Sequence, residues 1–322
     1  MRAWTVFTLL AITFFGISGT SAVFVSQHSP SSNQWSTLIN LLDGQNRFHN
    51  FLELLDSSNL FPKINTSLHF TVFAFPDSVF DGFPPNYIQA LKADQVKLDA
   101  LIGLHVILNT DYMFHGVVNQ ILTSSNFEHV RINEYNLLHI NTAQGVNVTT
   151  MNQEVVHGHV HIIDGIMKAP VPILPQYLTT RPDLTKFDNL IIQENLQDFF
   201  KSDTTSTIFL PNNDAWAKLS PHVMEYLNTH SADLTEVLKY HMSKASTLYS
   251  IGMRNKLTIP SANVHHDQLM ILQDGNGDFS IEHAQLIQID ISSETGVFHV
   301  IDHVLLPPRV LIAMETSGIV LG

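Results

Sequence analysis

One stretch of sequence occurs twice in this chain and decides how the rest is interpreted. Residues 71–80 read TVFAFPDSVF, and residues 207–216 read TIFLPNNDAW. Two further pairs follow in the same order: residues 104–106 (LHV) with 240–242 (YHM), and residues 161–166 (HIIDGI) with 299–304 (HVIDHV). The copies are 136 residues apart in the first two pairs (71 to 207, 105 to 241) and 138 in the third (161 to 299). This period fits a whole domain and is too long for a solenoid repeat. The chain therefore contains two copies of one domain, and its activity is expected from a tandem pair.

The N-terminus has the layout of a secretory signal peptide. Arg2 supplies a short positive region, residues 3–17 form an uncharged apolar run, and residues 18–22 are small. The apolar run is shorter than the roughly 20 residues of a membrane span. We predict a signal peptide over residues 1–22, a mature N-terminus near Val23, and no transmembrane segment after cleavage.

The composition excludes several kinds of chemistry. There is no cysteine, which rules out thiol catalysis, zinc–thiolate sites and thiol redox roles. The formal net charge of −13 disfavours nucleic acid and anionic membranes as partners, since both require basic surface. The 18 histidines would offset much of this charge in an acidic medium, or they reflect composition alone.

Each copy shows helical periodicity first and strand periodicity later, which indicates an α+β fold. In the first copy we expect helices over residues 36–42, 48–55 and 94–106, a buried strand over 70–75, and strands within 127–162. In the second we expect helices over 187–200, 221–227 and 234–242, a strand over 206–210, and further strands to Leu306. Prolines concentrate between the copies. The expected division is a first domain over 33–170, a Pro-rich linker over 171–183, a second domain over 184–308 and a C-terminal tail over 309–322.

The repeated blocks resemble those of the fasciclin-like domain family, and the resemblance covers nearly the whole mature chain. The second copy fits better, because it keeps Pro211 after the strand and the Tyr240-His241 pair. The first copy has Phe75 then Pro76 where the family usually has Pro then Thr, and Leu104 in place of Tyr. The resemblance implies two repeated domains, each a wedge or sandwich of β-strands flanked by N-terminal helices. It also implies extracellular adhesion through receptors, matrix or glycans, and it supplies no catalytic site.

The family-motif positions are expected to serve the fold. These residues are Thr71, His105, His161 and Asp164 in the first copy, and Thr207, His241, His299 and Asp302 in the second. His105 and His241 end apolar helical runs at the same place in both copies. A histidine on such a face is usually a satisfied core residue, so we predict that both are buried and hydrogen-bonded within their own domains.

Two other groups of residues are candidates for modification or metal binding. Asn65 and Asn147 begin glycosylation sequons, Asn-Thr-Ser and Asn-Val-Thr. His157, His159 and His161 alternate, so on a strand all three would share one face and could bind zinc or copper. Against this, His161 belongs to the repeated block and a fourth ligand is missing. We therefore predict no metal site, with these histidines as weak candidates, and no cofactor.

The sequence favours a secreted or cell-surface protein that acts in adhesion or in matrix or cell-wall organisation. Its expected partners are cell-surface or matrix proteins or glycans. One alternative is a secreted or vacuolar protein that binds a small apolar ligand or a glycan. A metal-dependent enzyme is a weaker alternative; no nucleophile-elbow motif is present, and we expect no enzymatic activity.

Overall fold

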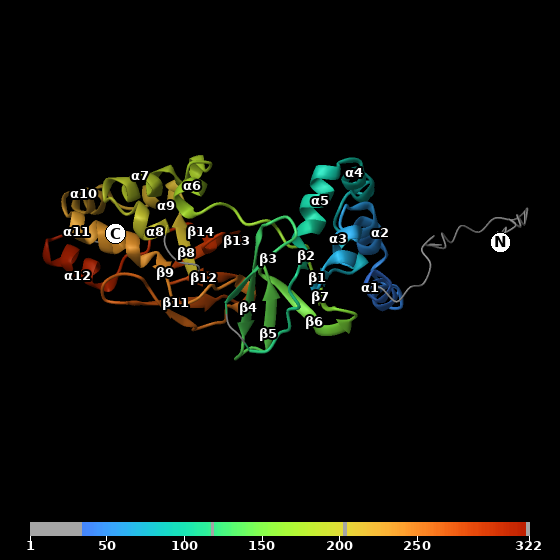
Figure 1. The fold of residues 1–322 in the computed structure, drawn as a ribbon. Helices are drawn as coiled ribbons and strands as arrows, with labels where there is room; N and C mark the ends of the chain where they lie inside the picture. Colours follow the sequence, from blue (N-terminus) through green and yellow to red (C-terminus); the bar gives the residue numbers. More distant parts are fainter. Residues whose placement is uncertain (1–33, 117–118, 202–204, 320–322) are drawn as a thin grey trace, which may run out of the picture. The chain divides into compact units, whose positions relative to one another are not determined.

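The computed structural model describes residues 34–116, 119–201 and 205–319 (Figure 1). The predicted signal peptide, residues 1–22, lies outside them. The first copy contains α1 (Gln34–Asp43), α2 (His49–Ser57), α3 (Phe61–Thr66), β1 (Phe70–Ala74), the 3-10 helix η1 (Asp77–Phe80), α4 (Tyr87–Ala93), α5 (Gln95–Leu104), β2 (Val106–Leu108), β3 (Gln120–Thr123), β4 (His129–Tyr135), β5 (Ile140–Ala143), β6 (Val146–Val155) and β7 (Gly158–Ile163).

The second copy repeats this order of helices and then strands. It contains α6 (Leu174–Leu178), η2 (Pro182–Leu184), α7 (Thr185–Gln193), α8 (Gln197–Lys201), β8 (Ser206–Pro211), α9 (Asn213–Ala217), α10 (Pro221–Thr229), α11 (Ser231–Tyr240), β9 (Met242–Ser243), η3 (Ser250–Gly252), β10 (Thr258–Pro260), β11 (Gln268–Gln273), β12 (Phe279–Ile281), β13 (Ala284–Ser293), β14 (Gly296–Ile301) and α12 (Pro308–Thr316).

The two copies share one sheet topology, as the repeat predicts. Within the described residues, the strand order is β2-β1-β7-β6-β5-β4-β3 in the first copy and β9-β8-β14-β13-β12-β11-β10 in the second. In each copy the early strand pairs in parallel with the closing strand, β1 with β7 and β8 with β14, while the other neighbours are antiparallel. The protein is therefore two repeats of one α+β domain.

The central strands are buried on both faces, because helices cover one face and the later strands curl over the other. In β8, Ile208 and Leu210 pack with α7, α10 and α11, whereas Phe209 joins Leu269 and Ile281 on the opposite side. Alternate side chains of a strand point to opposite faces. This explains why the repeated blocks read as continuous apolar runs, as expected for doubly covered parallel strands.

A glycine at the start of each closing strand lets the parallel pair form. Gly158 is paired with Phe70 in the first copy, and Gly296 with Ser206 in the second. A Cβ on Gly158 would lie 2.2 Å from the Phe70 carbonyl oxygen, and one on Gly296 would lie 2.0 Å from that of Ser206. Both distances are far below van der Waals contact, so only glycine fits at this crossing.

Some local predictions need correction. The single helix expected over residues 187–200 is two helices, because Asn195 adopts a left-handed conformation with φ of 55° between them. Residues 137–138, expected in a strand, lie in the turn between β4 and β5. Asp77 makes no capping hydrogen bond to η1, the 3-10 helix that it begins. Its carboxylate accepts hydrogen bonds from the amides of His49 and Asn50 at the start of α2, which are 28 and 27 residues away in sequence.

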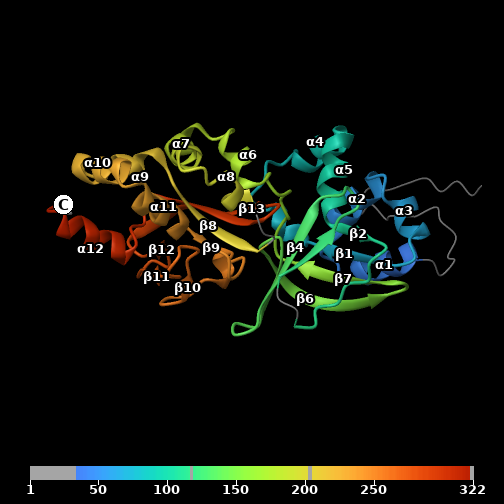
Figure 2. The ribbon, with the colours of Figure 1, turned by 60° about the vertical axis from the view of Figure 1, so that its left-hand side comes forward.

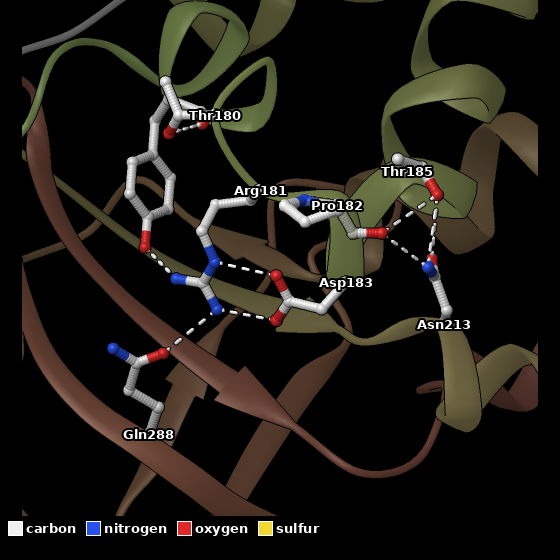
Figure 3. Close-up of polar contacts among 8 residues, drawn as sticks. Thr180, Arg181, Pro182, Asp183, Thr185, Asn213 and Gln288 are labelled. Carbon is white, nitrogen blue, oxygen red and sulfur yellow. Dashed lines mark hydrogen bonds and ion pairs between the residues drawn. The ribbon is translucent and has the colours of Figure 1, made fainter.

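The proline-rich segment between the copies packs onto the second copy. Leu174, Tyr177 and Leu178 of α6 belong to the second copy's core. The Arg181 guanidinium donates to both carboxylate oxygens of Asp183, at 2.7 and 2.8 Å, and to the Gln288 side chain of β13 at 3.0 Å. It also donates to the Tyr177 hydroxyl. The contacts with Asp183 and Gln288 can be followed in Figure 3. The segment is thus held to the second copy by the buried side chains of α6 and by the hydrogen bond from Arg181 to Gln288.

The stretch expected as a C-terminal tail contains a packed helix. Helix α12 begins at Pro308 and lies against α11 (Figure 2). Its Val310 and Met314 are buried in the same core as α10 and α11. Helix α12 is therefore part of the second copy's fold.

Contacts also join the two copies directly. The Tyr135 hydroxyl of β4 accepts from the Tyr249 amide at 2.9 Å and donates to the Thr247 carbonyl at 3.2 Å. Arg131, also on β4, donates to the Glu294 carbonyl at 3.2 Å. The described residues of both copies thus form one unit with shared hydrogen bonds.

Candidate functional site

His105 and His241 occupy the same place in the two copies, at the C-terminal ends of α5 and α11. Both side chains are fully buried. In His105, Nδ1 donates to the Leu101 carbonyl at 2.8 Å, and Nε2 accepts from the Met167 amide at 3.1 Å. His241 does the same with Val237 at 2.8 Å and Leu305 at 3.0 Å. Each imidazole ties the end of a helix to the segment that follows the closing strand.

His161 and His299 form a second matched pair on β7 and β14. In His161, Nδ1 accepts from the Asn152 amide at 3.0 Å, and Nε2 donates to the Tyr112 carbonyl at 3.0 Å. His299 makes the equivalent bonds to Asp290 at 3.3 Å and Leu248 at 2.9 Å. These bonds hold the loop after β2 or β9 against the sheet.

Two threonines support the same loops. The Thr71 hydroxyl donates to the Thr110 carbonyl at 2.9 Å and accepts from the Tyr112 amide at 2.8 Å. The Thr207 hydroxyl donates to the Ser246 carbonyl at 2.8 Å and accepts from the Leu248 amide at 2.9 Å. In each copy one threonine and one histidine therefore hold the same loop by hydrogen bonds. The hydroxyl and imidazole groups all bond to partners within their own domain.

The buried histidines are held in the neutral form. Burial lowers the pKa of His105, His161 and His241 to about 4 each, and it also lowers the pKa of His299. The hydrogen bonds agree, because one ring nitrogen of each imidazole donates and the other accepts, which only the neutral ring can do. A neutral imidazole with both nitrogens occupied is not available as a general base or a metal ligand.

The paired aspartates differ between the copies. Asp164 accepts from the Asn147 side chain at 2.9 Å. Asp302 accepts from the Gln285 amide at 2.8 Å, from His303 Nδ1 at 2.8 Å and from Lys218 Nζ at 3.0 Å. In the first copy this aspartate therefore bonds a side chain of the neighbouring strand. In the second copy it is the centre of a charged cluster formed by Asp302, Lys218 and His303.

The three alternating histidines do not share a strand face, which corrects the expectation. His157 lies in the turn between β6 and β7 with φ of 64°, so the alternation begins only at His159. His159 pairs with Asp111, while His161 uses both nitrogens as described above. Across the residues that the structure describes, no three His, Asp or Glu side chains gather as a metal site would require.

The two sequon asparagines lie at half-buried positions. Asn65 lies in α3 and Asn147 near the start of β6. The Asn147 side-chain nitrogen donates to Asp164, and a glycosylated asparagine keeps one N–H for such a bond.

A cavity of about 540 Å³ opens in the second copy beside this charged cluster. The apolar walls include Val223 of α10, Leu311 of α12 and Leu219 from the segment between α9 and α10. The polar lining comes from two helix ends and from two loops after strands. Lys218 follows α9 and Tyr240 ends α11, while Glu282 and His283 follow β12 and His303 follows β14. The His283 and His303 rings meet edge to face with centroids 5.6 Å apart. No sequence pattern predicts this cavity, although the HVIDHV block that distinguishes the second copy contains His303.

Helices in the described part of the chain are all too short or too polar to cross a bilayer.

This chain is similar to known proteins over most of its length. The sequence profile described as Fasciclin domain matches the chain twice, over residues 46–169 and 182–307. Human periostin is 23% identical over 269 residues, covering 82% of this chain and 31% of periostin. The chain thus spans less than a third of that relative's length.

Two other similar proteins match most of the chain. Aurofusarin biosynthesis cluster protein S of Gibberella zeae is 23% identical over 347 residues, covering 90% of this chain and 82% of that protein. Among solved structures, the FAS1 domain pair from the insect cell adhesion molecule fasciclin I covers 83% of this chain and 99% of that chain, at 17% identity and a TM-score of 0.41.

Proposed function

The chain belongs to the fasciclin domain family, and from that premise we propose that it is a secreted or cell-surface protein that mediates adhesion to matrix or cell-wall components through its two domains. The predicted signal peptide and the two sequons support an extracellular location and glycosylation. We further propose that the protein is not an enzyme, because the paired polar groups are used internally, by the fold.

The observation that carries the adhesive role is a matched exposed position on the long strands. Met151 on β6 and Ile289 on β13 occupy equivalent places, because the next residue in each case bonds to the paired histidine. Met151 is 46% exposed and Ile289 is 47% exposed, and Ile287 beside the latter is 53% exposed. Exposed apolar side chains that recur in both copies favour a contact surface that both domains present.

We expect the introduction of negative charge on this surface to abolish adhesion without unfolding the protein. The experiment immobilises residues 23–322 and measures retention of cells and of cell-surface extract from the source organism. A double variant with Met151→Asp and Ile289→Asp should lose retention, since a buried unpaired carboxylate would oppose the contact. Its thermal unfolding should match that of the unchanged protein, because both side chains are exposed.

The matched control is Val96→Asp, an equally drastic change at an exposed position in α5. This variant should retain cells normally. Retention no greater than on an uncoated surface for the unchanged protein would contradict the adhesive function. Full retention by the double variant would place the contact elsewhere.

A second function, binding of a small ligand, is favoured by the cavity of the second copy. Its volume lies within the range of about 300–1,000 Å³ that is typical of small-molecule sites. Its walls combine apolar side chains with a few convergent polar groups, as such sites usually do.

A further inference from the structure

The cavity of the second copy carries polar groups that the first copy lacks. The register of the closing strands is the same in both copies, because the amides of Asp164 and Asp302 donate to the carbonyls of Asn147 and Gln285. On this register the cavity residues His283 and His303 stand where the first copy has Gly145 and Gly165. At the 136-residue offset of the earlier repeated blocks, Lys218 and Tyr240 stand where it has Gly82 and Leu104. The shared fold does not require these side chains, since the first copy forms without them.

Hydrogen bonds at the cavity edge fix how His303 faces a ligand. Burial acts to raise the pKa of Asp302, but hydrogen bonds from His303 and Lys218 outweigh it and lower the pKa to about 2. Asp302 is therefore a carboxylate, and His303 Nδ1 donates to it at 2.8 Å. In a neutral imidazole held this way, Nε2 is left as a hydrogen-bond acceptor.

The charges around the cavity disfavour an anionic ligand. Lys218 already forms an ion pair with Asp302 at 3.0 Å, so its positive charge is neutralised by a carboxylate of the protein itself. Glu282 also lines the cavity and accepts from the Met270 amide at 2.7 Å. Because Lys218 and Asp302 neutralise each other, Glu282 leaves the cavity with a negative formal charge. An incoming carboxylate or phosphate would be repelled.

The walls favour a flat and largely apolar ligand. The His283 and His303 rings form an aromatic pair in the cavity lining, and Leu219, Val223 and Leu311 line the same cavity. Aromatic rings pack well against such surfaces in edge-to-face or offset arrangements. His283 is exposed and His303 half-buried, so a ligand can reach both rings from solvent.

We propose that this cavity binds a small neutral aromatic molecule that carries a hydroxyl group, of the phenol class, and that the hydroxyl donates to His303 Nε2. The inference rests on the small-ligand function proposed above and is independent of adhesion. It assigns specificity to His303 and the apolar contact to the helix side of the cavity.

The test measures binding of 1-naphthol and of 1-methoxynaphthalene to the full mature chain by calorimetry. The two probes share one ring system, and only the first can donate a hydrogen bond. We expect 1-naphthol to bind about tenfold more tightly, which is the effect of one hydrogen bond of ordinary strength. Leu311→Trp places a larger side chain in the cavity, so it should weaken the binding of both probes to the same extent.

His303→Phe keeps an aromatic ring and removes the acceptor, so it should cancel the preference for 1-naphthol. His222→Phe, at an exposed position of α10 outside the cavity, is the matched control and should leave the preference intact. Equal affinity of the unchanged protein for both probes would overturn the inference and leave a hydroxyl-independent ligand site. Absence of saturable binding for both probes at millimolar concentration would overturn the small-ligand function as well. The comparison of probes on the unchanged protein needs no variant to fold.

Discussion

Acidification from pH 7 to pH 4.5 is expected to unfold this protein. His105, His161 and His241 have pKa values of about 4 in the folded chain, against about 6.5 for a histidine in an unfolded chain. Between these values the unfolded chain binds more protons, so falling pH favours unfolding. The stabilisation is complete above pH 6.5 and disappears as the pH falls towards 4.

The size of this effect is set by the difference between folded and unfolded pKa values. A shift from about 6.5 to about 4 corresponds to about 3 kcal/mol for each group at neutral pH. The first copy holds two such groups, His105 and His161, and their sum is comparable with the total stability of about 5–15 kcal/mol of an ordinary domain. The buried His299 adds to the effect in the second copy.

Urea unfolding followed by circular dichroism at several pH values measures this directly. We expect the urea midpoint to fall steeply between pH 6.5 and pH 4.5, with recovery on return to pH 7. A midpoint that stays constant over this interval would mean that the buried histidines bind protons as readily in the folded chain as in the unfolded chain. That result would contradict their role as neutral, hydrogen-bonded core residues.

Gly296→Ala is expected to destabilise the second copy by at least about 3 kcal/mol. The new Cβ would lie 2.0 Å from the Ser206 carbonyl oxygen, and Gly296 has φ of 155°. Backbone strain and overpacking each cost about 1–3 kcal/mol, and the contact atom is main chain and cannot rotate away. The central parallel pair, β8 with β14, would have to separate.

Gly275→Ala is the matched control for this prediction. Gly275 lies in the turn between β11 and β12, no heavy atom lies within 4 Å of a built Cβ, and its φ is not positive. This variant should unfold at the same urea concentration as the unchanged protein. Equal unfolding of the Gly296 and Gly275 variants would show that the strand crossing tolerates a side chain.

The repeat and the main helices could be predicted from sequence because both are local patterns. Residues 71–80 and 207–216 carry their identity in consecutive positions, and apolar spacing marks α2 and α11. The order of helices before strands then identifies an α+β domain. Each of these patterns can be recognised within a window of about 18 residues, without knowing which distant residues pack together.

Features that depend on distant partners could not be predicted in this way. Asp77 caps α2 because the fold brings the two together, and its neighbours in sequence give no sign of this. Helix α12 (Pro308–Thr316) forms within the stretch expected as a tail because Val310 and Met314 meet a core formed mainly by residues far earlier in the chain. The cavity similarly combines α9, α10 and α12 with residues at 282–283 and 303, which only the folded chain brings together.

The most direct test of the account concerns whether the paired histidines serve the fold or a binding site. His241→Ala would leave the buried Leu305 amide and Val237 carbonyl without their partner, at a cost on the order of 1–3 kcal/mol. The measurement records thermal unfolding and cell retention on the same protein, with His222→Ala as the control. We predict that the second copy melts earlier while retention measured below that transition persists. Unchanged unfolding together with lost retention would make His241 a binding residue and contradict the account.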